Sequence, residues 1–112
     1  MTDLGRAMRF YSAVLGAPVK QEQTGSIPLG MLPTPDGKQM GCLVPTDGYR
    51  PSGDGVMIWF HVEGRLEAAV AATKAHGGKV LSDVRAIGGY GFRAEVLDSE
   101  GNRIALYSET ND

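Results

Sequence analysis

The sequence predicts a single α+β domain in which a unit of one helix followed by three strands occurs twice. Three observations support this prediction. The chain has 112 residues, which is the length of one domain. Helix-period and strand-length patterns follow each other in the same order in both halves of the chain. The 16 glycines fall at the ends of these patterns, as expected of many short elements joined by tight turns.

The first unit, residues 1–45, begins with a helix. Apolar residues recur at three- and four-residue spacing over Leu4–Leu15, Thr2 or Asp3 is a suitable N-cap, and Gly16 is a typical glycine after a helix. Three short strands follow, with a turn rich in proline and glycine before the last of them. Their predicted ranges are Val19–Thr24, Ile27–Leu32 and Lys38–Val44.

The second unit, residues 56–108, follows an aperiodic segment, 46–55, that is predicted to be a linker. It opens with a strand, Val56–Val62, for which the first unit has no counterpart. An alanine-rich helix, Leu66–His76, then ends at two glycines. The last three strands are predicted at Lys79–Val84, Phe92–Leu97 and Arg103–Ser108.

The two units also align residue by residue. Placing Leu4 on Leu66 brings Gly16 onto Gly78, and the turn at 36–37 resembles the turn at 100–101. Chance similarity between two turns is the alternative. Agreement of the helix, its glycine stop and the final hairpin favours a true repeat.

Composition argues against two classes of function. The formal net charge is −2 with no basic stripe, so a nucleic-acid partner is not expected. No apolar run approaches the roughly 20 residues that a membrane span needs. The single Cys42 cannot form an internal disulfide, which fits a reducing cytoplasm, and its place in a predicted strand favours a buried, inert thiol.

Alternation along the strand 56–62 separates two faces. The wholly apolar face is expected to pack under the second helix and carries Ile58, Phe60 and Val62. The other face carries Met57, Trp59 and His61. His61 could be an acid–base or ligand-binding group, or a half-exposed histidine at the rim of a cavity.

Further candidate residues lie in the last hairpin. Arg93 and Glu95 share one strand face, where they could hold a polar substrate or form an exposed pair of little energetic weight. Arg103 and Tyr107 share the face of Ala105. Tyr90, in a glycine-rich loop, suits either a lid or an aromatic clasp, and Glu63 and Glu67 suit the dipole of the second helix.

Four segments together resemble a known family. They are DLGRAMRFYSAVLG at 3–16, GGKV at 77–80, IGGYGF at 87–92 and DSEGNRI at 98–104. They resemble the vicinal oxygen chelate superfamily, especially small bacterial proteins described as glyoxalase-like. The resemblance implies paired βαβββ modules whose mixed sheets curl around a cavity, often within a homodimer. The first module of this chain would lack its first strand. It leaves the reaction open, because this scaffold hosts lyases, isomerases, dioxygenases, thiol transferases and drug-sequestering proteins.

Metal-dependent members of that superfamily place ligands on the first and last strands of each module. The matching last-strand positions are Gly41 and Ala105, which have no donor side chain. The matching first-strand position is Met57, or Ile58 without one extra residue, and a thioether is a poor ligand for zinc or magnesium. The resemblance therefore implies no metal and no other cofactor.

The sequence predicts a metal-independent protein that binds a small organic molecule in the cavity. The expected binding residues are Met57, Trp59, His61, Arg93, Arg103 and Tyr107. One alternative is an enzyme such as a glyoxalase-type lyase or isomerase, for which His61 and Glu95 are weak catalytic candidates. Another is an interaction module with a vestigial cavity.

The absence of a first strand in the first unit leads to a prediction about how the protein assembles. It would leave the strand Lys38–Val44 with an unpaired edge, so a homodimer that covers this edge is expected. The alternative is that the natural gene encodes further residues upstream of Met1.

Overall fold

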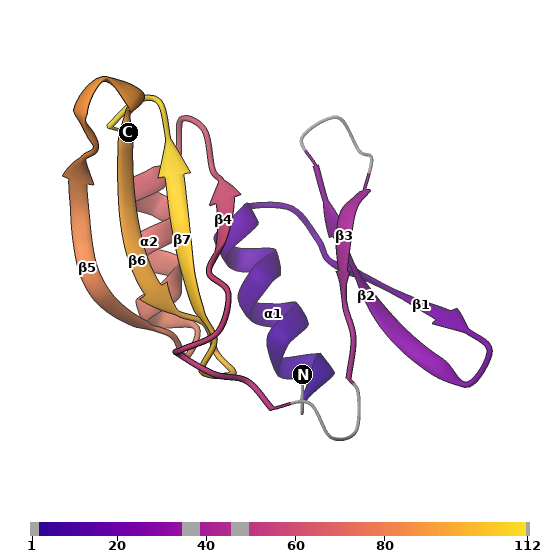
Figure 1. The fold of residues 1–112 in the computed structure, drawn as a ribbon. Helices are drawn as coiled ribbons and strands as arrows, with labels where there is room; N and C mark the ends of the chain where they lie inside the picture. The colour runs from indigo at the N-terminus through magenta and orange to yellow at the C-terminus, as the bar shows by residue number, and fades with distance from the viewer. Residues whose placement is uncertain (1–2, 35–38, 46–49, 112) are drawn as a thin grey trace.

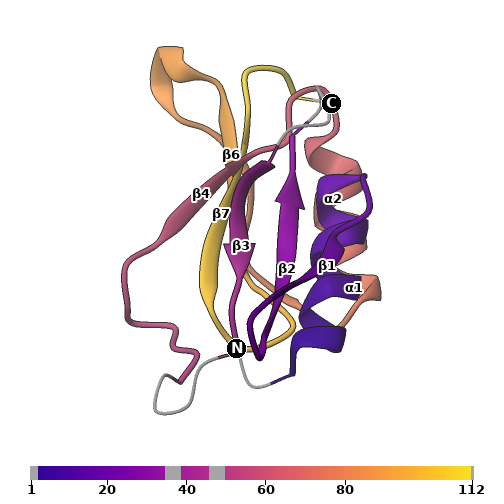
Figure 2. The same ribbon diagram turned by 90° about the vertical axis from the view of Figure 1, so that its right-hand side faces the viewer.

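The computed structural model describes residues 3–34, 39–45 and 50–111, which form two helices and two sheets (Figure 1). The helices α1 (Leu4–Leu15) and α2 (Leu66–Ala75) lie together on one side of the strands (Figure 2). The predicted α+β class is confirmed. Neither helix is long and apolar enough to cross a bilayer.

The first sheet is antiparallel and follows α1. Its strands are β1 (Lys20–Thr24), β2 (Ile27–Pro33) and β3 (Gln39–Leu43), in the order β1-β2-β3. The helix starts at Asp3, whose Oδ1 accepts the Arg6 backbone N–H at 3.0 Å, and stops at Gly16, which has the left-handed φ of 74°. Within the described residues the outer edge of β3 has no partner strand, as the sequence predicts.

The second sheet has the strand order β4-β7-β6-β5. Its members are β4 (Ile58–His61), β5 (Lys79–Ala86), β6 (Phe92–Leu97) and β7 (Arg103–Ser108). The edge strand β4 runs parallel to β7, and the other pairs are antiparallel. A single 3₁₀ turn, Gly88–Tyr90, forms the glycine-rich loop before β6.

The hydrophobic core lies between the helices and the inner faces of the sheets. Its largest fully buried apolar side chains are Phe10, Val14, Leu66, Val96 and Leu106, so both units contribute to one core. The Tyr11 ring packs against Phe60 with ring centroids 5.4 Å apart. The helix of the first unit is thereby attached to the sheet of the second.

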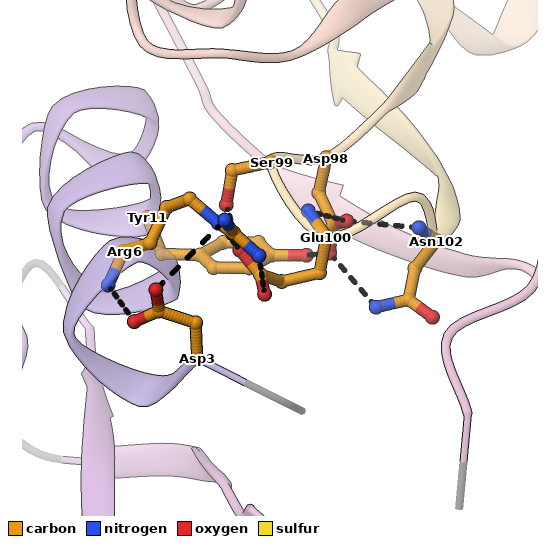
Figure 3. Close-up of polar contacts among 7 residues, drawn as sticks. All are labelled: Asp3, Arg6, Tyr11, Asp98, Ser99, Glu100 and Asn102. Carbon is orange, nitrogen blue, oxygen red and sulfur yellow. Dashed lines mark hydrogen bonds and ion pairs between the residues drawn. The ribbon is translucent and has the colours of Figure 1, made fainter.

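Polar contacts strengthen this attachment at the β6–β7 turn (Figure 3). The Tyr11 hydroxyl donates to Oδ2 of Asp98 at 2.6 Å, and Asp98 is only 2% exposed. Arg6 donates from Nε and Nη2 to the two carboxylate oxygens of Glu100, at 2.7 and 2.9 Å. The Arg6 hydrogen bonds lower the pKa of Glu100, and burial followed by the neighbouring Asp98 raises the pKa of Tyr11.

Three details differ from the sequence-based prediction. The first strand of the second unit is shorter than 56–62, and Ile58 is 55% exposed instead of packed under α2. The apolar face of β4 meets α1 instead, since the Tyr11 ring packs against Phe60, which is buried. Strand β5 continues to Ala86. The turn predicted at 33–37 falls largely outside the described residues.

Candidate functional site

The open face of the second sheet, turned away from α2, carries most of the predicted site residues. The register places Trp59 beside Ala105 and Glu95 in one row across the sheet. The next row contains His61, Tyr107 and Arg93. Side chains that pair across a sheet share a face, so the predicted phase of β4 is confirmed for Trp59 and His61.

Three rings gather at one end of this face. The Tyr107 ring centroid lies 5.0 Å from that of His61 and 6.1 Å from that of Trp59. The Tyr107 hydroxyl donates to the backbone carbonyl of Tyr90, while the Tyr90 residue itself is 80% exposed. The loop is therefore held through its backbone, and its aromatic ring is free to contact another molecule.

Glu95 binds both arginines of the predicted site. Its Oε1 accepts from Nε and Nη2 of Arg103 at 3.0 and 2.5 Å, and its Oε2 accepts from Nη1 of Arg93. The hydrogen bonds from Arg103 are the main cause of a lowered pKa at Glu95, with both positive charges adding to it. Glu95 is largely buried, so this is not the weak exposed pair that the sequence favoured. The carboxylate is committed to positioning the arginines, which makes it a poor general base.

His61 is paired with an acid that the sequence assigned elsewhere. Its Nε2 lies 2.7 Å from Oε1 of Glu63, and the same oxygen accepts the backbone N–H of Glu109 at 2.7 Å. The Glu109 N–H, followed by the His61 hydrogen bond, lowers the pKa of Glu63. Glu63 thus orients His61, the last residue of β4, beside the end of β7. The sequence had assigned Glu63 to the dipole of α2.

A groove of about 640 Å³ lies between the edge strands β3 and β4. Its walls include Cys42 and Leu43 on one side and Trp59 and Phe60 on the other, and Tyr11 of α1 also lines it. In the part of the chain that the structure describes, no strand pairs with β3 on this side. The groove is therefore a product of how the two units meet.

Only two of the six predicted binding residues line the groove. Trp59 and Arg103 line the groove, whereas the other four predicted residues do not: Met57, His61, Arg93 and Tyr107. Arg50 lines it too, and sequence reasoning missed it because the aperiodic segment around it carries no signal. Cys42 is exposed in the groove, which corrects the prediction of a buried thiol. As part of an edge strand, it has no further strand over it in the described residues.

The donor set does not fit a divalent metal ion. The positions at which the resemblance implies ligands hold Gly41, which is exposed, and Ala105, which is fully buried and has no donor atom. Over residues 3–34, 39–45 and 50–111, no three His, Cys, Asp or Glu side chains gather in a way that could hold a metal. Of the acids beside the predicted site residues, Glu95 is already paired with two arginines and Glu63 with His61.

Comparisons with known proteins place this geometry in context. A sequence model of the Glyoxalase/Bleomycin resistance protein/Dioxygenase superfamily matches residues 1–106. A solved glyoxalase/bleomycin resistance protein from Albidiferax ferrireducens is 23% identical, with a TM-score of 0.70 over 96% of this chain and 91% of that one. A fosfomycin resistance protein from Listeria monocytogenes is 15% identical, with a TM-score of 0.67 over 96% of this chain and 85% of that one. At such identities the likeness shows the fold alone. Comparison with curated protein sequences gives no significant match.

Proposed function

The chain belongs to the glyoxalase/bleomycin resistance protein/dioxygenase superfamily, and on that premise we propose that it binds a small organic molecule, without a metal, in the groove between β3 and β4. The observation that carries the proposal is the groove itself. Its volume of about 640 Å³ falls in the range of ligand pockets, and an exposed indole forms part of its wall.

The side chains around the groove suit a ligand with an apolar or aromatic body. Leu43, Phe60 and Ile104 supply apolar surface. Trp59 is 47% exposed, which leaves its ring available for stacking. Arg103 supplies a positive charge that Glu95 holds in position. These groups provide contact area and one oriented polar anchor, which is the usual composition of a binding pocket.

Trp59 is the single tryptophan of the chain, so its fluorescence reports the groove directly. A screen of small aromatic and aliphatic compounds should identify molecules that raise the melting temperature and shift the indole emission together. A ligand at 100 times its Kd stabilises the folded state by about 2.7 kcal/mol.

The matched variants are Trp59→Ala and Ile27→Ala. Both remove an exposed apolar side chain, but Ile27 lies on β2 outside the groove lining. The first variant should abolish the ligand-induced stabilisation and the second should retain it. A ligand that stabilises both variants equally, or leaves the indole emission unchanged, would contradict binding in this groove.

The His61–Glu63 pair favours a second candidate function, a proton-transfer reaction such as that of a glyoxalase-type lyase or isomerase. In the tautomer whose Nε2–H donates a hydrogen bond to Glu63, the Nδ1 atom of His61 carries the lone pair and can accept a proton. A positioned base of this kind contributes about 10²- to 10⁴-fold in rate. NMR of carbonyl compounds in deuterated water would detect exchange of an acidic C–H, and that activity should fall in both His61→Asn and Glu63→Gln. Activity that survives both variants would exclude this role for the pair.

We also propose that the protein forms a homodimer in which a second copy covers the free edge of β3 and closes the groove. Besides this edge, the neighbourhood of the groove exposes Val56 by 90% and Ile58 by 55%, and exposed apolar surface on an unpaired strand edge favours association. Sedimentation at micromolar concentration is the test. A monomer with a sharp melting transition would refute the proposal.

A further inference from the structure

We propose that the ligand of the groove is an organic anion: a carboxylate, sulfonate or phosphonate carried on an apolar or aromatic body. This inference rests on the proposed function and names the chemical class of the ligand. It follows from the charge of the groove lining, from the way Arg103 is held, and from the place of Trp59 beside it.

The groove lining is positively charged although the chain is not. The charged side chains among its described residues are Arg50 and Arg103, and no described aspartate or glutamate lines it. The whole chain carries a formal net charge of −2, so the positive charge of the groove is local. Two cations in a cleft whose other described lining residues are uncharged favour a negatively charged ligand, because attraction between opposite charges is stronger beside the protein than in bulk water.

Glu95 only partly neutralises the positive charge beside the groove. Two arginines share this one carboxylate, so the cluster of Arg93, Glu95 and Arg103 carries a net charge of +1 (two positive, one negative). The bonds from Arg103 to Glu95 use Nε and Nη2, and Nη1 remains outside that ion pair. Arg103 is thus a guanidinium of fixed orientation with donor capacity left over, and its side chain is 44% exposed.

Trp59 gives the expected position of the apolar part of the ligand. Trp59 pairs with Ala105, and Arg103 precedes Ala105 by two residues on the same strand and face. Two residues along a strand span about 7 Å, which is the length of a small aromatic acid. A planar ring stacked on the indole would therefore bring its acidic group toward the guanidinium.

The experiment compares two fluorescent probes that share an aromatic framework. One is 1-anilinonaphthalene-8-sulfonate, which is an anion, and the other is neutral N-phenyl-1-naphthylamine. Titration at constant ionic strength gives the Kd of each probe for the native protein and for two variants. Arg103→Gln removes the groove arginine. Arg9→Gln is the matched control, because Arg9 is an exposed arginine of α1 that belongs neither to this cluster nor to the groove lining.

We expect the native protein to prefer the anionic probe at least tenfold. Arg103→Gln should weaken binding of the anionic probe about tenfold or more, the loss typical of a charged hydrogen bond, and leave the neutral probe within twofold. Arg9→Gln should leave both probes within twofold. Unchanged binding of the neutral probe also verifies that each variant is folded, and Arg50→Gln provides a second groove variant that leaves Glu95 paired.

Two results would overturn the inference in distinguishable ways. Equal affinity for the two probes, or equal losses in Arg9→Gln and Arg103→Gln, would mean that the groove binds apolar molecules without selecting charge, and the proposed function would stand. Failure of both probes to bind or to alter Trp59 fluorescence would overturn the inference and the proposed function together.

Discussion

Replacing Tyr11 with phenylalanine tests the contact that joins the two units of the fold. The substitution keeps the aromatic ring against Phe60 and removes only the hydroxyl, which donates to Oδ2 of Asp98 at 2.6 Å. Asp98 is almost fully buried, and this oxygen would retain one partner, Nδ2 of Asn102 at 3.1 Å. The other oxygen keeps two backbone N–H donors, those of Glu100 and Asn102.

A hydrogen bond to a buried charged group is worth about 1.5–3 kcal/mol, so Tyr11→Phe should lower the free energy of unfolding by about that amount. At about 4 °C per kcal/mol for a domain of this size, the melting temperature should fall by about 6–12 °C. Combining Tyr11→Phe with Asp98→Asn should cost less than the sum of the single losses, since both remove the same interaction.

Urea denaturation followed by Trp59 fluorescence, together with calorimetry, measures the effect. The control is Tyr90→Phe, because the Tyr90 ring is exposed and its loop is held through the backbone. That variant should unfold within about 0.5 kcal/mol of the native protein, as is usual for surface substitutions. A Tyr11→Phe protein as stable as the Tyr90→Phe control would refute the structural role of this hydrogen bond.

Three further predictions address glycine packing, pH and metal content. Gly78→Ala should destabilise the protein by about 1–3 kcal/mol through overpacking. The added Cβ would lie 2.6 Å from the Leu97 carbonyl oxygen and 2.7 Å from Phe10. The control Gly89→Ala places its Cβ where nothing lies within 4 Å, so its stability in chemical denaturation should be nearly unchanged. Arg6 lowers the pKa of Glu100 from its ordinary 4.5. The stability that this ion pair adds to the folded protein is therefore complete above pH 4.5 and is lost as the pH falls through the lower folded-state pKa. Melting curves should show this loss of stability at acidic pH, and the loss should be smaller in Arg6→Gln. Elemental analysis should find no stoichiometric divalent metal, and a chelator should leave the melting temperature unchanged; one tightly bound zinc or nickel per chain would overturn the metal-free prediction.

The secondary structure could be predicted because its signals are local. The spacing of apolar residues in α1, the glycine after it and the turn residues before β7 each act within a few residues of where they stand. The alternation around Trp59 predicted which side chains of β4 turn away from α2, since successive residues of a strand point to opposite faces. The error at Ile58 arose because alternation predicts the face on which a side chain lies, but not whether another element covers that face.

The candidate site depended on contacts between residues far apart in the chain. Alternation predicted that Arg93 and Glu95 share a face, but the competition of Arg103 for the same carboxylate follows from the pairing of β6 with β7. The partnership of Glu63 with the Glu109 backbone, at the end of β7, likewise has no sequence signal.

The sequence by itself determined the elements, their order, the repeat and the face on which Trp59 lies. Tertiary structure alone decided the groove, the exposure of Cys42 and the approach of Arg50 to it, as well as the ion pair between Arg6 and Glu100, 94 residues apart. The physical reason is that helix and strand patterns arise from each residue's relation to its near neighbours, whereas a groove and its charge arise where two separately patterned units pack together.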